Sequence, residues 1–196
     1  MLEPLGIAIH TVDLGKIKPG MTVGVFGSGP IGLLIIQMAK LAGAANIIAT
    51  DKLAHRVEAA KRFGASQAFL VDDQRGLGEM RAAVQERGVD VAFDAAGVQD
   101  AVDDAFAAVR PGGKVILAGI PDNDRTSFSA SIARRKGLTI KLVRRMKHTY
   151  PRAIEMVSKG LVDVRSLVTH RFLLEESREA FRVAEGREGL KVVIEL

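Results

Sequence analysis

Residues 22–51 form the segment that most constrains the fold of this chain. An apolar run is followed by three glycines with the spacing G-x-G-x-x-G, which are Gly27, Gly29 and Gly32. A second apolar run follows, then a third, and Asp51 closes the third at 19 residues after the last glycine. A glycine triplet alone is weak evidence. Here strand, glycine turn, helix, strand and acid occur in the order that a dinucleotide-binding unit requires.

Each residue of this segment has a physical role in such a unit. Gly27 allows the tight turn out of the strand, Gly29 lets a pyrophosphate approach the backbone, and Gly32 lets the helix pack closely on the strand. Pro30 suits the first helical turn because its missing N–H would have no helical partner there. The free amides of that turn would face the phosphates. Asp51 would accept hydrogen bonds from both adenosine ribose hydroxyls.

Composition limits the classes of protein to which the chain can belong. With 196 residues, 47% hydrophobic and 26% charged, it is expected to fold around one globular core. The chain has no cysteine, and its histidines (His10, His55, His148 and His170) lack metal-ligand spacing, so we expect no metal site here. The net charge of +5 accompanies no nucleic-acid motif. We expect a cytoplasmic protein that binds neither nucleic acid nor membrane.

Short apolar runs alternate with helical patterns through the middle of the chain. We expect strands at Thr22–Phe26, Asn46–Thr50, Gln67–Val71, Val89–Phe93, Lys114–Ala118 and Leu138–Val143. We expect helices at Ile31–Leu41, Ala54–Phe63, Leu77–Glu86 and Ala101–Val109, the last of them stopped by Pro111-Gly112-Gly113. Such alternation predicts a Rossmann doubly wound α/β fold, with a parallel six-stranded sheet in the order 3-2-1-4-5-6 and the ligand beyond the carboxyl ends of the strands.

The two flanks differ from this central unit, which we assign to residues 19–148. Residues 1–18 are predicted to form an amphipathic lead-in helix with Leu5, Ile9 and Val12 on one side. Residues 149–196 are predicted to form a small C-terminal α+β remnant. Its elements are a helix at Pro151–Lys159, an extended piece at Leu167–Phe172, a helix at Glu175–Ala184 and a strand at Lys191–Leu196.

Five motifs occur in order along the chain: Glu3-Pro-Leu, Gly27-Ser-Gly-Pro-Ile-Gly32, Phe93-Asp-Ala-Ala-Gly97, Arg110-Pro-Gly-Gly-Lys-Val115 and Leu167-Val-Thr-His-Arg-Phe172. Together they resemble the zinc-type medium-chain alcohol dehydrogenase family, nearest its sorbitol (polyol) and threonine dehydrogenase branch. The likeness covers essentially the whole chain. In that family a catalytic domain of about 150 residues precedes the coenzyme domain, and the last stretch returns to the catalytic domain. The resemblance therefore implies that the catalytic domain, with its Cys, His and Glu zinc ligands, is missing here.

The resemblance also implies a set of site residues. Ile31 would touch the pyrophosphate, and Arg56 would lie beside Asp51 at the ribose. The other cofactor-binding residues follow the fourth, fifth and sixth strands and are Ala96, Ala118, Gly119, Ile120, Val143, Arg144 and Arg145. Those after the fifth strand would line the nicotinamide. Glu3 resembles the glutamate that reaches the zinc or its bound water, and Arg145 the arginine that contacts that glutamate and the substrate.

The implied function is the NAD(H)-binding portion of a zinc-dependent dehydrogenase that oxidises a polyol or another secondary alcohol. Zinc would be present only in an intact parent enzyme, so this chain alone would not turn over. NAD is favoured over NADP because the Asp51 carboxylate would repel a 2′-phosphate. The implied partners are an alcohol substrate and further copies of the chain. A homodimer or homotetramer would form through the edge strand at Leu138–Val143.

Three other functions use a similar glycine turn. A zinc-independent NADPH quinone oxidoreductase-like domain is disfavoured by Asp51 and by Glu3-Pro-Leu. A non-enzymatic dinucleotide-sensing module would need an effector domain, and no helix-turn-helix pattern is present. An S-adenosylmethionine methyltransferase is disfavoured by the glycine spacing and by the later motifs.

Overall fold

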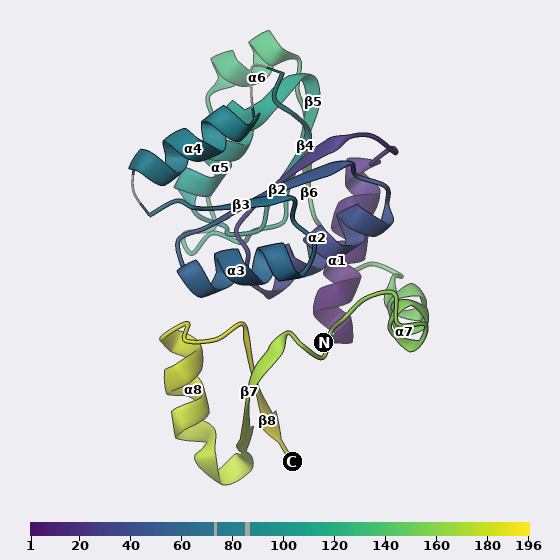
Figure 1. The fold of residues 1–196 in the computed structure, drawn as a ribbon, viewed down its shortest axis with the longest axis vertical. Helices are drawn as coiled ribbons and strands as arrows, with labels where there is room; N and C mark the ends of the chain where they lie inside the picture. The colour runs from purple at the N-terminus through teal and green to yellow at the C-terminus, as the bar shows by residue number, and fades with distance from the viewer. Residues whose placement is uncertain (73, 85–86) are drawn as a thin grey trace.

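The computed structural model describes residues 1–72, 74–84 and 87–196, and its centre is a six-stranded sheet (Figure 1). The strand order is β3-β2-β1-β4-β5-β6, which confirms the predicted Rossmann topology. The strands are β1 (Thr22–Phe26), β2 (Asn46–Asp51), β3 (Gln67–Leu70), β4 (Val89–Asp94), β5 (Val109–Leu117) and β6 (Thr139–Leu142). All neighbouring strands are parallel, so their carboxyl ends meet at one edge of the sheet.

Helices cover both faces of this sheet (Figure 1). On one face lie α1 (Leu2–Gly15), α2 (Pro30–Leu41) and α3 (Ala54–Arg62). On the other lie α4 (Gln74–Val84), α5 (Gln99–Ala108) and α6 (Ala130–Lys136). The central strand β4 is buried at every position, as a parallel sheet covered on both faces requires.

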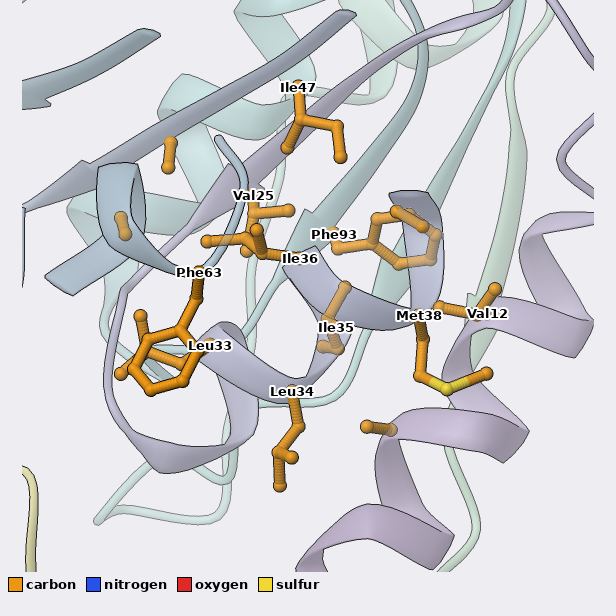
Figure 2. Packing of buried hydrophobic residues seen from close by; sticks show 14 of the residues in the cluster. Val12, Val25, Leu33, Leu34, Ile35, Ile36, Met38, Ile47, Phe63 and Phe93 are labelled. Atoms are coloured by element: carbon orange, nitrogen blue, oxygen red, sulfur yellow. The ribbon is translucent and has the colours of Figure 1, made fainter. Parts of the chain in front are cut away.

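The lead-in helix α1 is part of the main hydrophobic core. Figure 2 shows Phe93 of β4 and Leu33 of α2 in this cluster, both fully buried, together with Val12 of α1. Leu5 and Ile9 are also fully buried in it, as the sequence predicted for this side of the helix. Burying a large aliphatic side chain contributes about 1.5–3 kcal/mol. Helix α1 is therefore held by apolar packing against the elements of the Rossmann sheet and helix α2.

The C-terminal part forms a smaller α+β layer, as predicted. Helix α7 (Tyr150–Ser158) packs against α1, and the chain then enters β7 (Val168–Leu173). A 3₁₀ turn η1 (Leu174–Glu176) and helix α8 (Ser177–Glu185) lead to β8 (Lys191–Glu195), which pairs with β7 in parallel.

Specific contacts join this layer to the Rossmann elements. The Gln37 side chain of α2 donates to the Asp163 carbonyl at 3.0 Å and accepts from the Asp163 N–H at 2.8 Å. The Thr149 hydroxyl donates to the Gly6 carbonyl at 3.0 Å. Leu190, beside β8, belongs to the same buried cluster as α1 and α2. The boundaries drawn at residues 18/19 and 148/149 stay predictions.

Three local expectations differ from the structure. Helix α4 begins at Gln74 rather than at Leu77, and the expected last residue, Glu86, lies outside the described residues. Strand β5 begins at Val109, so Pro111-Gly112-Gly113 lies inside the strand, where the pairing with β4 shifts register. Helix α6 was not predicted. It buries no residue, so its sequence lacks the apolar spacing of a core helix.

Candidate functional site

The glycine turn lies at the edge where the parallel strands end, between β1 and α2. Gly27 has a φ of +99°, and its N–H donates to the Thr50 carbonyl of β2 at 3.0 Å. A Cβ built on Gly27 would lie 2.8 Å from the Ala96 backbone N. A Cβ on Gly32 would lie 1.9 Å from the Gly27 carbonyl oxygen. The fold itself therefore requires glycine at these two positions.

Gly29 differs from the other two glycines of the triplet. It is the N-cap of α2, with φ −70° and ψ −174°, a conformation open to any residue. Among the described residues, a Cβ built there would have one heavy atom within 4 Å, the Arg56 Nη1 at 3.7 Å. Pro30 occupies the first turn, and the leading N–H groups of a helix lack intrahelical partners. The structure thus leaves open space over the positive end of the α2 dipole.

Asp51 ends β2 and faces this turn. Its residue surface is 9% exposed, and its carboxylate accepts from the Ser28 N–H at 2.8 Å and from the Leu53 N–H at 3.0 Å. The Arg56 Nη1 atom lies 4.0 Å from the Asp51 carboxylate. Within the part of the chain that the structure describes, the buried Arg56 Nε has no hydrogen-bond partner. The structure therefore brings Gly29, Asp51 and Arg56 together around one space.

A second buried carboxylate organises the neighbouring loops. Asp94 ends β4, is 1% exposed, and accepts from the N–H groups of Ala96 at 3.0 Å and Gly97 at 3.1 Å. Burial raises the pKa of Asp94, although the N–H groups of Gly97, Ala96 and Gly119 oppose that shift. Its carbonyl accepts from Ala118 and Gly119, which follow β5. Sequence reasoning used Asp94 only as a motif member and missed this role. An acid that closes an apolar strand, as Asp51 does, was the available signal.

The loops after β4 and β5 fit together through their glycines. A Cβ on Gly119 would lie 2.1 Å from the Gly97 N, and one on Gly97 would lie 2.6 Å from the Ile120 carbonyl oxygen. Ile120 follows directly and is 85% exposed, while Ala118 is half-buried. An exposed aliphatic side chain beside the carboxyl ends of the strands is a surface on which a flat ring can pack.

The residues after β6 complete this edge. The Val143 N–H donates to the Leu117 carbonyl of β5 at 2.9 Å, so Val143 continues the line of the sheet. Arg144 and Arg145 are exposed, and Arg145 has a φ of +46°. These positions agree with a cofactor that extends along the strand ends, but their contacts with it stay predictions.

Glu3 and Arg145 lie on neighbouring segments and are not paired. Glu3 is exposed in the first turn of α1. A Cβ on Gly6, one turn further, would lie 3.0 Å from the Met146 Cβ. Among residues 1–72, 74–84 and 87–196, no ion pair or hydrogen bond joins Glu3 to Arg145. Their catalytic roles stay predictions.

The described residues contain no group of three His, Asp or Glu side chains that could hold a metal ion. They also contain no helix that is long and apolar enough to cross a membrane.

Comparison with known proteins identifies the family. Residues 30–159 match the family model of the zinc-binding dehydrogenases. The chain is 36% identical to the sorbitol dehydrogenase of Bacillus subtilis strain 168 over 99% of its own length and 56% of that protein.

Solved structures share its fold. An alcohol dehydrogenase from Escherichia coli CFT073 complexed with NADH matches with a TM-score of 0.90 and 29% identity, over all of this chain and 58% of that one. A protein of Sinorhizobium meliloti 1021 bound to NADP matches with a TM-score of 0.90 and 26% identity, over 98% of this chain and 57% of that one. The chain thus spans little more than half the length of the relatives it matches. The family model, the sequence identity and the shared fold agree, and the chain belongs to the zinc-binding dehydrogenase family.

Proposed function

We propose that this chain is the NAD(H)-binding portion of a zinc-dependent dehydrogenase that oxidises a polyol or another secondary alcohol. The observation that carries the proposal is the space at Gly29. The fold requires glycine at Gly27 and Gly32, but neither backbone strain nor a nearby atom requires it at Gly29. A ligand that must approach the backbone of the α2 N-terminus explains that glycine, and a pyrophosphate is such a ligand.

The surrounding residues fit the rest of the dinucleotide. Asp51 would accept hydrogen bonds from the adenosine ribose, because each carboxylate oxygen has a lone pair beyond the one used by Ser28 or Leu53. Arg56 would stand beside the ribose and the phosphates, where its unpartnered Nε would gain an acceptor. Ile120 would pack on the nicotinamide side. When bound, NAD supplies the ring that accepts hydride from the alcohol carbon.

Zinc does not fit the residues described here, since they offer no three-ligand group. We propose that metal ligands and the alcohol pocket belong to a part of such an enzyme outside this chain. A polyol is the proposed substrate because the chain is 36% identical to a protein named sorbitol dehydrogenase, of which it covers 56%.

The edge strand β6 is the proposed contact between copies of the chain. Its outer edge has no strand partner in the described sheet, and Leu142 on it is 74% exposed. An exposed apolar edge strand is a template for pairing with a second sheet. We propose a homodimer, or a tetramer built from such dimers, with the two sheets continuous across this edge.

Titration of the purified chain with NADH tests the proposed cofactor. We expect saturable binding at one site per chain, and no NADH production from polyols or L-threonine even with zinc added. Absence of binding for both NADH and NADPH would overturn the proposal. Turnover by this chain alone would show that its own residues complete an active site.

The genomic reading frame upstream of Met1 separates the enzyme from a dinucleotide-sensing module. We expect an in-frame extension that carries Cys and His-Glu zinc ligands. A frame that encodes an effector domain instead would favour the sensing module.

A further inference from the structure

Lys52, the residue directly after Asp51, forms an ion pair with a carboxylate that lies far from it in the sequence. The Lys52 Nζ atom bonds the Asp100 carboxylate at 3.0 Å. This pair joins the turn between β2 and α3 to the first turn of α5, which follows the loop that Asp94 organises. The two side chains are 58% and 75% exposed, so neither is needed to fill the core.

The charges around Asp51 are paired in a particular way. Arg56 faces the Asp51 carboxylate itself, at 4.0 Å. Lys52 faces Asp100. A phosphate on the 2′-oxygen of a ribose held by Asp51 would therefore meet that carboxylate, while both adjoining cations already stand opposite an acid. If Lys52 lost its contact with Asp100, its ammonium group could pair with such a phosphate, because its four-carbon stem is flexible.

We propose that Asp100 is a positioning residue for Lys52 and that, through Lys52, it sets the preference of this site between NADH and NADPH. The inference rests on the proposed nucleotide-binding function. With Asp100 present, both cations near the ribose site stand opposite a carboxylate and no uncompensated positive charge faces a 2′-phosphate, which favours the free 2′-hydroxyl. Without Asp100, Lys52 loses the carboxylate that it contacts and can turn toward a 2′-phosphate, against the remaining electrostatic attraction of Asp104. In this proposal, discrimination between NADH and NADPH depends on Asp100, a residue of α5 that contacts neither the ribose hydroxyls nor the glycine turn.

The test compares dissociation constants for NADH and NADPH, measured by nucleotide fluorescence at low salt. For Asp100→Asn we expect the ratio of the two constants to shift toward NADPH by about 1.4- to fivefold, the range typical of an exposed ion pair. The shift should shrink at high ionic strength, where exposed charges are screened. Asp100→Ser serves as a second variant that also removes the charge.

Glu58→Gln is the matched control. Glu58 pairs with Lys61 at 2.9 Å on α3 and is 71% exposed, so this change removes one nearby negative charge without touching Lys52. For Glu58→Gln, the ratio of the NADH and NADPH dissociation constants should equal that of the unmodified chain. In a Lys52→Met background, Asp100→Asn should leave the ratio unchanged.

Each other outcome overturns the inference. An equal ratio in Asp100→Asn and Glu58→Gln would show that the pair does not set the preference. A shift that survives in the Lys52→Met background would show that Asp100 does not act through Lys52. NADH binding with an unaltered ratio defeats this inference alone, whereas absence of binding by either nucleotide defeats the proposed function as well.

Discussion

Replacing Gly29 by alanine should strongly weaken dinucleotide binding and leave the fold intact. Alanine adopts φ −70° and ψ −174° without strain, and the nearest atom to the new methyl group would be the Arg56 Nη1 at 3.7 Å. Losing a glycine N-cap costs a few tenths to about 1 kcal/mol. Reduced freedom of the unfolded chain returns about 0.4–1 kcal/mol. The free energy of unfolding should therefore change by no more than about 0.5 kcal/mol.

The effect on binding should be much larger. The methyl group would occupy the space through which the pyrophosphate approaches the N–H groups of α2. Each hydrogen bond to a charged group that is lost costs about 1.5–3 kcal/mol. The dissociation constant for NADH should then rise by roughly tenfold to a hundredfold for each such bond.

Gly32→Ala is the matched comparison on the same helix. Its Cβ would lie 1.9 Å from the Gly27 carbonyl oxygen, whereas carbon–oxygen contacts lie at about 3.3–3.6 Å. The turn or the helix must move by more than about 1 Å, and overpacking of this kind costs about 1–3 kcal/mol or more. This variant should lose both stability and binding.

Urea unfolding followed by circular dichroism, together with NADH titration, separates the two variants. NADH binding by Gly29→Ala with the affinity of the unmodified chain would refute the placement of the pyrophosphate. Destabilisation of Gly29→Ala as large as that of Gly32→Ala would show that the fold, not a ligand, requires the glycine.

Three further predictions concern charge and assembly. The chain should bind NADH more tightly than NADPH in calorimetric titrations. Asp51→Ala should narrow that difference and lower stability by about 1–3 kcal/mol, because the buried Ser28 N–H loses its acceptor; tighter binding of NADPH by the unmodified chain would contradict this. Burial alone would raise the pKa of Asp90, but hydrogen bonds from the Arg110 guanidinium and a backbone N–H hold that pKa below its usual value. The ionised Asp90 carboxylate therefore adds stability above about pH 4 that is lost as the pH falls through the lowered pKa. In urea unfolding, the free energy of unfolding should fall less between pH 7 and pH 3 for Asp90→Asn than for the unmodified chain. Leu142→Lys should convert the expected dimer to a monomer in light scattering, and an unmodified chain that is already monomeric would refute the β6 contact.

The centre of the sheet was predictable from the sequence because β1, β2 and β4 are buried at nearly every position. Such strands are short, continuous apolar runs, and β1 and β4 match their expected ranges to within one residue. Helix α6 was missed for the opposite reason. It packs at the surface and buries no residue, so only its Ser129 cap and Gly137 end marked it. A hydrophobic pattern in a sequence arises from positions that are buried, so a helix that buries few side chains shows little of it.

The position of the site could be predicted from the sequence, but the hydrogen bonds within it could not. Chain order placed Asp51 at the end of a strand beside the glycine turn. It could not show that the Asp51 carboxylate also binds the Ser28 and Leu53 N–H groups, nor that Asp94 holds two loops by the same means. The bond from Ser28 to Asp51 joins segments 23 residues apart in the sequence, so its geometry exists only after the sheet has formed.

The glycine triplet shows most clearly what the structure adds. In the sequence, only their order in the motif assigns Gly27 and Gly32 to the fold and Gly29 to a ligand. In the structure, a Cβ built on Gly27 or Gly32 would lie 2.8 Å or less from a backbone atom, whereas one built on Gly29 would have the Arg56 Nη1 atom, at 3.7 Å, as its nearest neighbour. A fold that binds nothing there could place alanine at Gly29 with little loss of stability. The glycine at that position is therefore better explained by a ligand than by the fold, and the Gly29→Ala and Gly32→Ala pair tests that explanation without reference to any relative.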